Sequence, residues 1–263
     1  MVKVSDSKKT VLVTGGSRGI GYETAKEFLK HGYNVAIIDI AEDSKDKVVS
    51  ELSQYGSVNY VVFDLRKTSQ IPEAVKEAIK PYGRLDALIN NASTGAHDDL
   101  LSISIERWDS YMDLALKSMF FVSQAAAALM IDCNSKGAIV SLSSLRADRA
   151  DGTHMLYSVA KAGIAAMARE LAFSLGKYGI RVNAVMPGFV RTEMTEHYID
   201  ETPGFIDQLY SLQALEKVLD ASDMAKVIYF LASDENTGIT AQCIKADAGI
   251  GTIELPPKKA QHA

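Results

Sequence analysis

Short apolar runs alternate along the chain with longer segments in which apolar residues recur every three or four positions. Runs of β-branched residues predict buried strands, and a 3.6-residue period predicts amphipathic helices. We expect strands over residues 10–14, 34–39, 58–63, 85–89, 138–142, 181–186 and 242–246. We expect helices from residue 22 onward and over about 44–55, 69–82, 105–130, 157–178 and 221–232. This alternation predicts a single-domain α/β fold, a doubly wound (Rossmann) parallel sheet of seven strands with helices on both faces.

Residues 193–216 interrupt the alternation, because they lack a firm helical or strand period and contain Pro203-Gly204. A loop of this length in a compact domain usually has a function, so we expect it to cover a substrate pocket. Residues 1–255 are expected to form the one domain, and residues 256–263 a solvated tail.

Composition excludes several classes of protein. The formal net charge is −5 and the basic residues are scattered, which argues against binding to nucleic acid or to an anionic membrane. The amino terminus has no apolar signal core, and no apolar run reaches the roughly 18 residues of a membrane span. Cys133 and Cys243 are too few and too isolated for a disulfide framework or a metal site. We expect a soluble, cytoplasmic protein without a metal.

A glycine-rich turn, Gly15-Gly16-Ser17-Arg18-Gly19-Ile20-Gly21, directly follows the first expected strand and opens the first helix. Glycines at such a turn let the backbone approach a pyrophosphate, whose charge then rests on amides at the start of the helix. The turn alone is a weak signal. It gains weight from Asp39, which ends the second strand about 20 residues later, where a carboxylate would bind the hydroxyls of an adenosine ribose.

Asp39 and Arg18 point to different cofactors. The Asp39 carboxylate would accept hydrogen bonds from a free ribose 2′-hydroxyl and repel a 2′-phosphate, which favours NAD. The Arg18 guanidinium could instead pair with the 2′-phosphate of NADP. We give Asp39 more weight, since repulsion beside a buried ribose is harder to avoid than a mobile arginine. NAD is therefore expected, with NADP as the less favoured cofactor.

Tyr157 and Lys161 are four residues apart on an expected helix, so their side chains share one face. A nearby ammonium would lower the pKa of the Tyr157 phenol from its ordinary value of about 10, toward the range in which a general acid or base works at neutral pH. Ser144 lies thirteen residues before the tyrosine and could hold the same substrate oxygen. Taken alone, the Tyr157–Lys161 pair could also be an ordinary surface pair.

The candidate residues fall at the carboxyl ends of the expected strands, where ligands bind in doubly wound sheets. They are Gly15, Asp39, Asp64, Asn91, Ser144 and Pro187. Asn91 and its neighbour Asn90 could bind the adjacent loop and a cofactor ribose, or serve as turn formers.

Over nearly its full length the chain resembles the classical short-chain dehydrogenases/reductases. The resemblance rests on Thr14-Gly15-x-x-x-Gly19-x-Gly21, Asn90-Asn91-Ala92, Ser144 with Tyr157-x-x-x-Lys161, Arg181-Val182-Asn183 and Pro187-Gly188-x-Val190-x-Thr192. It implies that Ser144, Tyr157 and Lys161 are catalytic, that Tyr157 is the general acid/base, and that Lys161 also holds the nicotinamide ribose. The candidate cofactor-binding residues are Gly15, Ser17, Arg18, Ile20, Gly21, Asp39, Asp64, Leu65, Asn91, Tyr157, Lys161, Pro187, Gly188, Val190 and Thr192.

The implied activity is an NAD(P)-dependent oxidoreductase that transfers a hydride between a nicotinamide cofactor and a secondary alcohol or ketone, as an alcohol dehydrogenase or carbonyl reductase. The resemblance also implies a homotetramer or homodimer paired through the helices at 105–130 and 157–178.

Two positions depart from the family pattern. Ser93 replaces a glycine, which would strain the backbone if a positive φ is required there. Ala115 replaces an asparagine that, in the family, helps hold a water linking Lys161 to solvent. Other groups could hold this water, the enzyme could be slow, or the chain could be a catalytically weak or inactive dinucleotide-binding oligomer that acts as a sensor or scaffold.

Substrate identity is not fixed by these motifs. The charged residues of 145–154 allow a polar or anionic substrate such as a sugar or hydroxy acid, or they simply face solvent. The apolar residues of 193–216 would equally suit a small lipid or steroid. His97 and His154 could contact the substrate or be structural.

Overall fold

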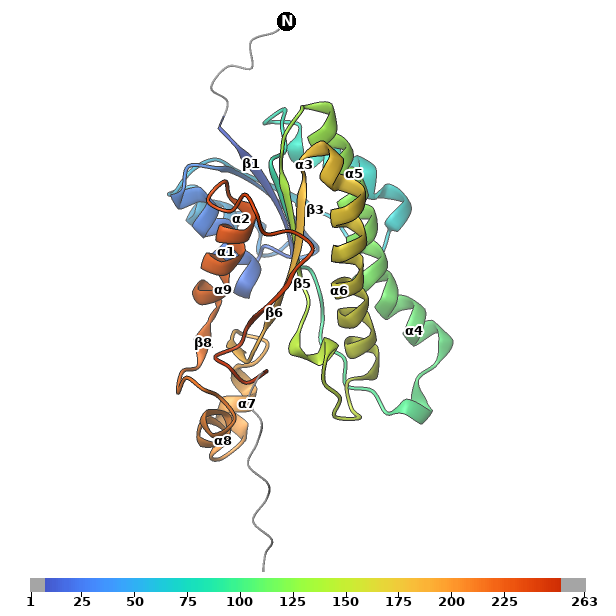
Figure 1. Cartoon of the computed structure of the whole chain (residues 1–263), viewed down its shortest axis with the longest axis vertical. Helices are drawn as coiled ribbons and strands as arrows, with labels where there is room; N and C mark the ends of the chain where they lie inside the picture. The colour runs from blue at the N-terminus through green and yellow to red at the C-terminus, as the bar shows by residue number, and fades with distance from the viewer. Residues whose placement is uncertain (1–7, 252–263) are drawn as a thin grey trace, which may run out of the picture.

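The structure, a computed structural model, describes residues 8–251 (Figure 1). Its seven-stranded sheet has the order β3-β2-β1-β4-β5-β6-β9, and every neighbouring pair is parallel. The strands are β1 (Thr10–Thr14), β2 (Asn34–Asp39), β3 (Val58–Val62), β4 (Ala87–Asn90), β5 (Ala138–Leu142), β6 (Arg181–Pro187) and β9 (Cys243–Ala246). The expected strands are confirmed, as is the doubly wound fold. The expected tail at 256–263 lies outside the described residues.

Helices cover both faces of the sheet (Figure 1). One face carries α1 (Gly19–Lys30), α2 (Lys45–Leu52) and α9 (Ala221–Ala232); the other carries α3 (Ile71–Ile79), α5 (Ser118–Asp132) and α6 (Met155–Leu175). Strand residues alternate between the two cores, so that Val11 and Val13 join the first and Leu12 the second. Burial on both faces explains why the strands are continuous apolar runs.

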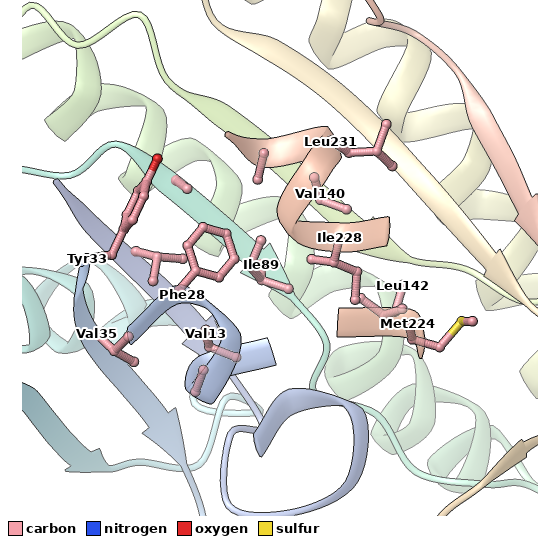
Figure 2. Close-up of a cluster of buried hydrophobic side chains, with 14 of the residues drawn as sticks. Val13, Phe28, Tyr33, Val35, Ile89, Val140, Leu142, Met224, Ile228 and Leu231 are labelled. Atoms are coloured by element: carbon pink, nitrogen blue, oxygen red, sulfur yellow. The ribbon is translucent and has the colours of Figure 1, made fainter. Parts of the chain in front are cut away.

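Figure 2 shows the first core, where Phe28 of α1 and Ile228 of α9 pack over Val13 and Ile89 of the sheet. The carboxyl ends of the central strands are level, because Thr14 pairs with both Ile38 and Asn90. The turns that follow β1, β2 and β4 therefore lie side by side. Strands are added on one side of β1 up to β3 and on its other side from β4 onward, and such a switch point between β1 and β4 opens a crevice for a ligand.

The expected helix at 105–130 is interrupted. It consists of α4 (Ile105–Met112), a π-helical turn η3 (Asp113–Lys117) and α5. By length and composition, the stretch Ile105–Asp132 could cross a membrane, since an 18-residue window within it has a mean hydropathy of 1.6, although charged residues keep it from being an unbroken apolar run. In the fold α5 is a core helix, since Val122, Ala126 and Met130 are fully buried against the sheet and its neighbours.

Residues 193–216 are not the unstructured loop that we expected. They contain α7 (Glu196–Glu201) and α8 (Phe205–Ser211), which lie at the lower end of the molecule in Figure 1, beyond the carboxyl ends of the strands. Gly204 has a φ of 72° and turns the chain between the two helices. Contacts of Phe205 with Phe189 and Tyr198 stabilise the segment, and such contacts leave no periodic trace in the sequence.

The remaining elements are short. A second sheet pairs β7 (Val190–Arg191) with β8 (Leu219–Asp220), and four 3-10 turns are η1 (Thr68–Gln70), η2 (Leu100–Ser102), η4 (Leu145–Ala147) and η5 (Gly176–Tyr178). The β7–β8 pair fixes the base of the segment that carries α7 and α8.

Candidate functional site

A cleft of about 1060 Å³ lies at the carboxyl ends of the central strands. It brings together every candidate site residue except Gly21, which lies behind the glycine turn. The candidates that line it are Gly15, Ser17, Arg18, Ile20, Asp39, Asp64, Leu65, Asn91, Ser144, Tyr157, Lys161, Pro187, Gly188, Val190 and Thr192. Its size is that of a pocket for a large organic cofactor. Within residues 8–251, no cluster of three His, Cys, Asp or Glu side chains could hold a metal ion.

The glycine turn is built so closely that side chains are excluded. Gly15 has a φ of 68°, and a Cβ on Gly21 would lie 2.1 Å from the Gly15 carbonyl oxygen. Gly21 thus allows α1 to begin directly against the turn, which leaves the amides at the helix start facing the cleft. The described residues fit the pyrophosphate of a dinucleotide at this point.

Asp39 is held in one orientation at the end of β2. One carboxylate oxygen accepts a hydrogen bond from the Ser17 amide at 2.9 Å, and the other accepts one from the Ala41 amide at 3.0 Å. The carboxylate is buried and lines the cleft. It therefore presents a fixed negative charge and fixed acceptors where the adenosine ribose is expected.

Two of the basic side chains at this end of the cleft form ion pairs with carboxylates. Arg18 is exposed and lies 3.7 Å from Glu193. Arg66 binds both carboxylate oxygens of Asp64, and its hydrogen bonds lower the pKa of Asp64. Lys47 also lines the cleft. The sequence analysis did not predict a role for Arg66. An arginine two residues after Asp64 is close enough to pair with that carboxylate, and this spacing could have indicated the contact.

Asn91 ties the β4 turn to the glycine turn. Its side-chain amide donates to the carbonyl oxygens of Thr14 and Gly15, at 3.1 and 2.8 Å. The Thr14 hydroxyl in turn accepts from the amides of Asn91 and Ala92. Asn91 therefore binds the neighbouring loop, which is one of the roles that the sequence predicted for it. The Thr14 hydroxyl, which was not predicted to have a role, holds the β4 turn in place.

Ser144, Tyr157 and Lys161 converge on the inner wall of the cleft. Ser144 follows β5, while Tyr157 and Lys161 lie on the first turns of α6. The Lys161 ammonium donates to the Leu142 carbonyl oxygen at 2.7 Å and lies 5.4 Å from the centre of the Tyr157 ring. The Ser143 hydroxyl donates to the Lys161 carbonyl oxygen at 2.8 Å, which anchors α6 to the end of β5.

The expected lowering of the Tyr157 pKa by Lys161 is wrong for this structure. Burial raises the pKa of Tyr157, and only the Ser144 hydroxyl and the Arg146 guanidinium oppose the rise. Burial also lowers the pKa of Lys161 to about 8. The desolvation of both groups outweighs their attraction, because the lysine binds a backbone carbonyl over the tyrosine ring instead of approaching the phenol oxygen.

The two departures from the family pattern have different structural settings. Among the described residues, positive φ outside glycine occurs at Asn134, Ala241 and Ala248, so Ser93 carries no such strain. Ala115 is fully buried in the π-helical turn, in a cluster with Tyr111, Leu156 and Ala160.

Replacing Ala115 by asparagine should leave the turnover rate within about tenfold of the natural protein and lower the free energy of unfolding by about 1–3 kcal/mol. The larger, polar side chain would enter a packed apolar cluster, which explains the loss of stability. Steady-state kinetics and urea unfolding test both parts, with Ala115→Val as a control for volume alone. A 100-fold gain in rate, about 2.7 kcal/mol in barrier, would show instead that a proton relay is broken in the natural chain.

Comparisons with known proteins agree with this geometry. The family model described as Enoyl-(Acyl carrier protein) reductase matches residues 15–251. The chain is 35% identical over 244 residues to the 3-oxoacyl-(acyl-carrier-protein) reductase FabG of Chlamydia muridarum. The matched residues make up 92% of this chain and 97% of the relative. It is 34% identical over 244 residues to a relative from Rhizobium meliloti named Probable galactose dehydrogenase GalD, with 91% and 94% covered. A solved short-chain type dehydrogenase/reductase from Mycobacterium ulcerans is 27% identical, with a TM-score of 0.87 over 92% of this chain and 90% of that one.

Proposed function

Because the chain belongs to the classical short-chain dehydrogenase/reductase family, we propose that it transfers a hydride between a nicotinamide cofactor and a secondary alcohol or ketone. The observation that carries this proposal is the meeting of the glycine turn, Asp39 and the Ser144, Tyr157 and Lys161 side chains in one cleft. One domain over residues 1–255 would perform the reaction, with residues 193–216 over the substrate.

Each of the three side chains has a distinct task. The Ser144 hydroxyl would hold the substrate oxygen, and the Tyr157 phenol would give a proton to a carbonyl or take one from an alcohol. Lys161 would hold the nicotinamide ribose and keep a positive charge beneath the tyrosine ring. The bound cofactor supplies the hydride acceptor or donor. Since burial keeps the Tyr157 phenol protonated at neutral pH, the phenol is ready to act as an acid on a carbonyl.

The fixed Asp39 carboxylate supports a preference for NAD over NADP. Both of its oxygens are oriented by backbone amides, so it cannot turn away from a 2′-phosphate at low cost. Arg18 in the glycine turn, the residue that would favour NADP, lies next to Glu193 instead. Ile40, the next residue after Asp39, lines the cleft with an apolar side chain.

Substituting Asp39 should change the cofactor preference. We expect Asp39→Ala to lower the ratio of kcat/KM with NAD to kcat/KM with NADP by at least about tenfold, because like-charge repulsion of the 2′-phosphate is lost. Asp39→Asn is the matched control for geometry, since it retains an acceptor for the Ser17 or Ala41 amide but not the charge; it should shift the ratio in the same direction. A natural protein that already prefers NADP would show that Arg18 outweighs Asp39.

A catalytically weak or inactive dinucleotide-binding oligomer, acting as a sensor or scaffold, is the second candidate, and Ala115 is the observation that favours it. Absorbance of NADH over a panel of alcohols separates the two functions, with Tyr157→Phe as the control. Turnover that depends on Tyr157 supports the oxidoreductase. Tight NAD binding without turnover on any alcohol supports the second candidate.

The long helices support assembly into a homodimer or homotetramer. Apolar side chains on α4, α5 and α6 are exposed, most of all Phe173 at 93%, and the others include Trp108, Phe120, Ile131 and Val159. Apolar surface on these helices would be covered by a second copy of the chain in such an assembly. Light scattering on the purified chain measures the oligomeric state. We also propose a cytoplasmic location.

A further inference from the structure

Three segments that are far apart in the sequence meet beside Tyr157. His97 follows β4, His154 precedes α6, and Tyr198 lies on α7. The two histidine rings are 4.0 Å apart, and the Tyr198 hydroxyl lies 3.4 Å from Nε2 of His97. The His154 ring is 6.3 Å from the Tyr157 ring. We call His97, His154 and Tyr198 the histidine rim.

The backbone holds the histidine rim in place. Asp98 and His154 form a parallel β-bridge, and the Asp98 amide donates to the Thr153 carbonyl oxygen at 3.1 Å. Arg107 at the start of α4 binds the Asp98 carboxylate at 2.9 Å. The two histidines are therefore adjacent because of the fold of two loops, and their placement is built into the structure.

Aromatic rings continue from the histidine rim through α7 and α8 to Phe189, next to residues that line the cleft. The Tyr198 ring is stacked at 6.3 Å from that of Phe205, which is 4.8 Å from that of Phe189. Phe189 lies between Gly188 and Val190, which line the cleft. These side chains thus combine flat apolar rings with polar tips that can both donate and accept hydrogen bonds.

The fixed charges around the histidine rim are compensated internally. Asp151 binds Nδ1 of His154 at 2.8 Å and the Arg146 guanidinium at 2.7 Å. Burial acts against the shift, but hydrogen bonds from Thr153 and His154 and the charge of Arg146 lower the pKa of Asp151 to about 2. Lys245 likewise pairs with Asp148 at 3.0 Å. Of the cations in residues 145–154, Arg146 already has a carboxylate partner and Arg149 binds the Ile250 carbonyl oxygen, so this segment gives little support to an anionic substrate.

We propose that the substrate is a neutral polyhydroxylated ring, a cyclic polyol or a sugar in its ring form, bound by the histidine rim and the Phe189–Phe205 rings. This inference rests on the proposed oxidoreductase function. The C–H bond of one carbinol carbon breaks and its electron pair passes as a hydride to NAD⁺, which becomes NADH. The proton of the same hydroxyl passes to the Tyr157 phenolate, which becomes the phenol, and a C=O bond forms.

The hydrogen-bonding groups explain why such a ring fits better than an acyl chain or a steroid. Nδ1 of His154 binds Asp151, and among the described residues no hydrogen bond is made by its Nε2, so Nε2 can serve a substrate hydroxyl near Tyr157, whose ring is 6.3 Å away. An apolar substrate would cover the polar tips of the histidine rim without replacing their hydrogen bonds to water, and each group left without a partner would weaken binding. A site built for hydroxyl groups therefore rejects analogues that lack them.

The test compares matched substrates on the full chain with NAD. The polyhydroxylated set is myo-inositol, D-glucose and D-galactose; the apolar match is cyclohexanol, the deoxy matches are 2-deoxy-D-glucose and 2-deoxy-D-galactose, and an acetoacetyl thioester with NADH represents acyl substrates. We expect kcat/KM for at least one polyhydroxylated ring to exceed that for cyclohexanol and for the thioester by 100-fold or more. A lower or equal value for every polyhydroxylated ring overturns the inference, while turnover of the other compounds leaves the oxidoreductase function intact.

Variants of the histidine rim assign the preference to these residues. His97→Phe should raise KM and the dissociation constant of the preferred ring, measured by calorimetry with NADH, by at least tenfold. His31→Phe is the matched control, because the His31 ring also lies against an aromatic ring, 3.9 Å from that of Tyr229, but His31 follows the carboxyl end of α1, opposite the glycine turn. Unchanged binding in His97→Phe overturns the role of the histidine rim. Absence of turnover on every compound, with NAD still bound, instead overturns the oxidoreductase function itself.

Discussion

A Tyr157→Phe variant should lose at least about 10³-fold in kcat/KM for both alcohol oxidation and ketone reduction, while its affinity for NADH stays within about threefold. The change removes only the hydroxyl from a ring that lines the cleft beside Ser144. Proton transfer by a positioned side chain contributes about 10²- to 10⁴-fold to a rate. The other tyrosine that lines the cleft, Tyr22, donates its hydroxyl to Glu51 instead. Stopped-flow or steady-state NADH absorbance measures the rate, and NADH fluorescence measures the affinity.

The pH dependence and a control sharpen this result. Oxidation needs the phenolate, so kcat/KM for an alcohol should rise with pH, and the variant should lose this rise. Tyr82→Phe is the matched control, because the Tyr82 hydroxyl binds the Val35 carbonyl oxygen at the amino end of β2, away from the cleft. A variant Tyr157→Phe that retains a tenth of the natural rate would contradict the assignment of Tyr157 as the proton donor.

Replacing Lys161 by methionine should abolish the pH dependence that this lysine gives to stability, in addition to lowering kcat/KM by about 10³-fold. Burial lowers the pKa of Lys161 from 10.5 to about 8. The unfolded chain therefore binds a proton more tightly than the folded one, and the stability contributed by this group rises as the pH increases from about 8 toward 10.5. Between pH 7 and 9.5 we expect the natural protein to gain about 2 kcal/mol relative to the variant.

Urea unfolding of both proteins at several pH values measures this difference. Subtracting the variant is necessary because burial raises the pKa of Tyr33, Tyr60 and Tyr111, and these tyrosines destabilise the fold as the unfolded chain ionises at high pH. Their effect is common to both proteins and cancels. Parallel curves for the two proteins between pH 7 and 9.5 would show that Lys161 is not desolvated in the fold.

The accuracy of the strand predictions has a simple physical cause. A strand buried on both faces must be apolar throughout, as in Val11 to Val13, and it must end where the chain meets solvent at a glycine or a polar residue. Parallel strands then bring those ends to one edge. For this reason local sequence was sufficient to place Gly15, Asp39, Asn91 and Ser144 in a common cleft.

Other features depend on contacts between distant segments. α7 and α8 are ordered by packing of Phe205 on Phe189 and Tyr198, which gives no period along the chain. The π-helical turn at Ala115 occupies a segment whose apolar spacing resembles that of a regular helix. The pairing of His97 with His154 requires two loops to form a β-bridge across more than fifty residues of sequence.

The sequence by itself determined the doubly wound sheet, the glycine turn and the residues that share the cleft, because each follows from spacing and from burial within one segment. Tertiary structure alone decided the ionisation of Tyr157 and Lys161 and the meeting of the histidine rim with the rings of Phe189 and Phe205. The pKa values of Tyr157 and Lys161 depend on the water that neighbouring elements exclude, and that meeting depends on side chains from four separate segments. Neither quantity is a property of any short stretch of chain.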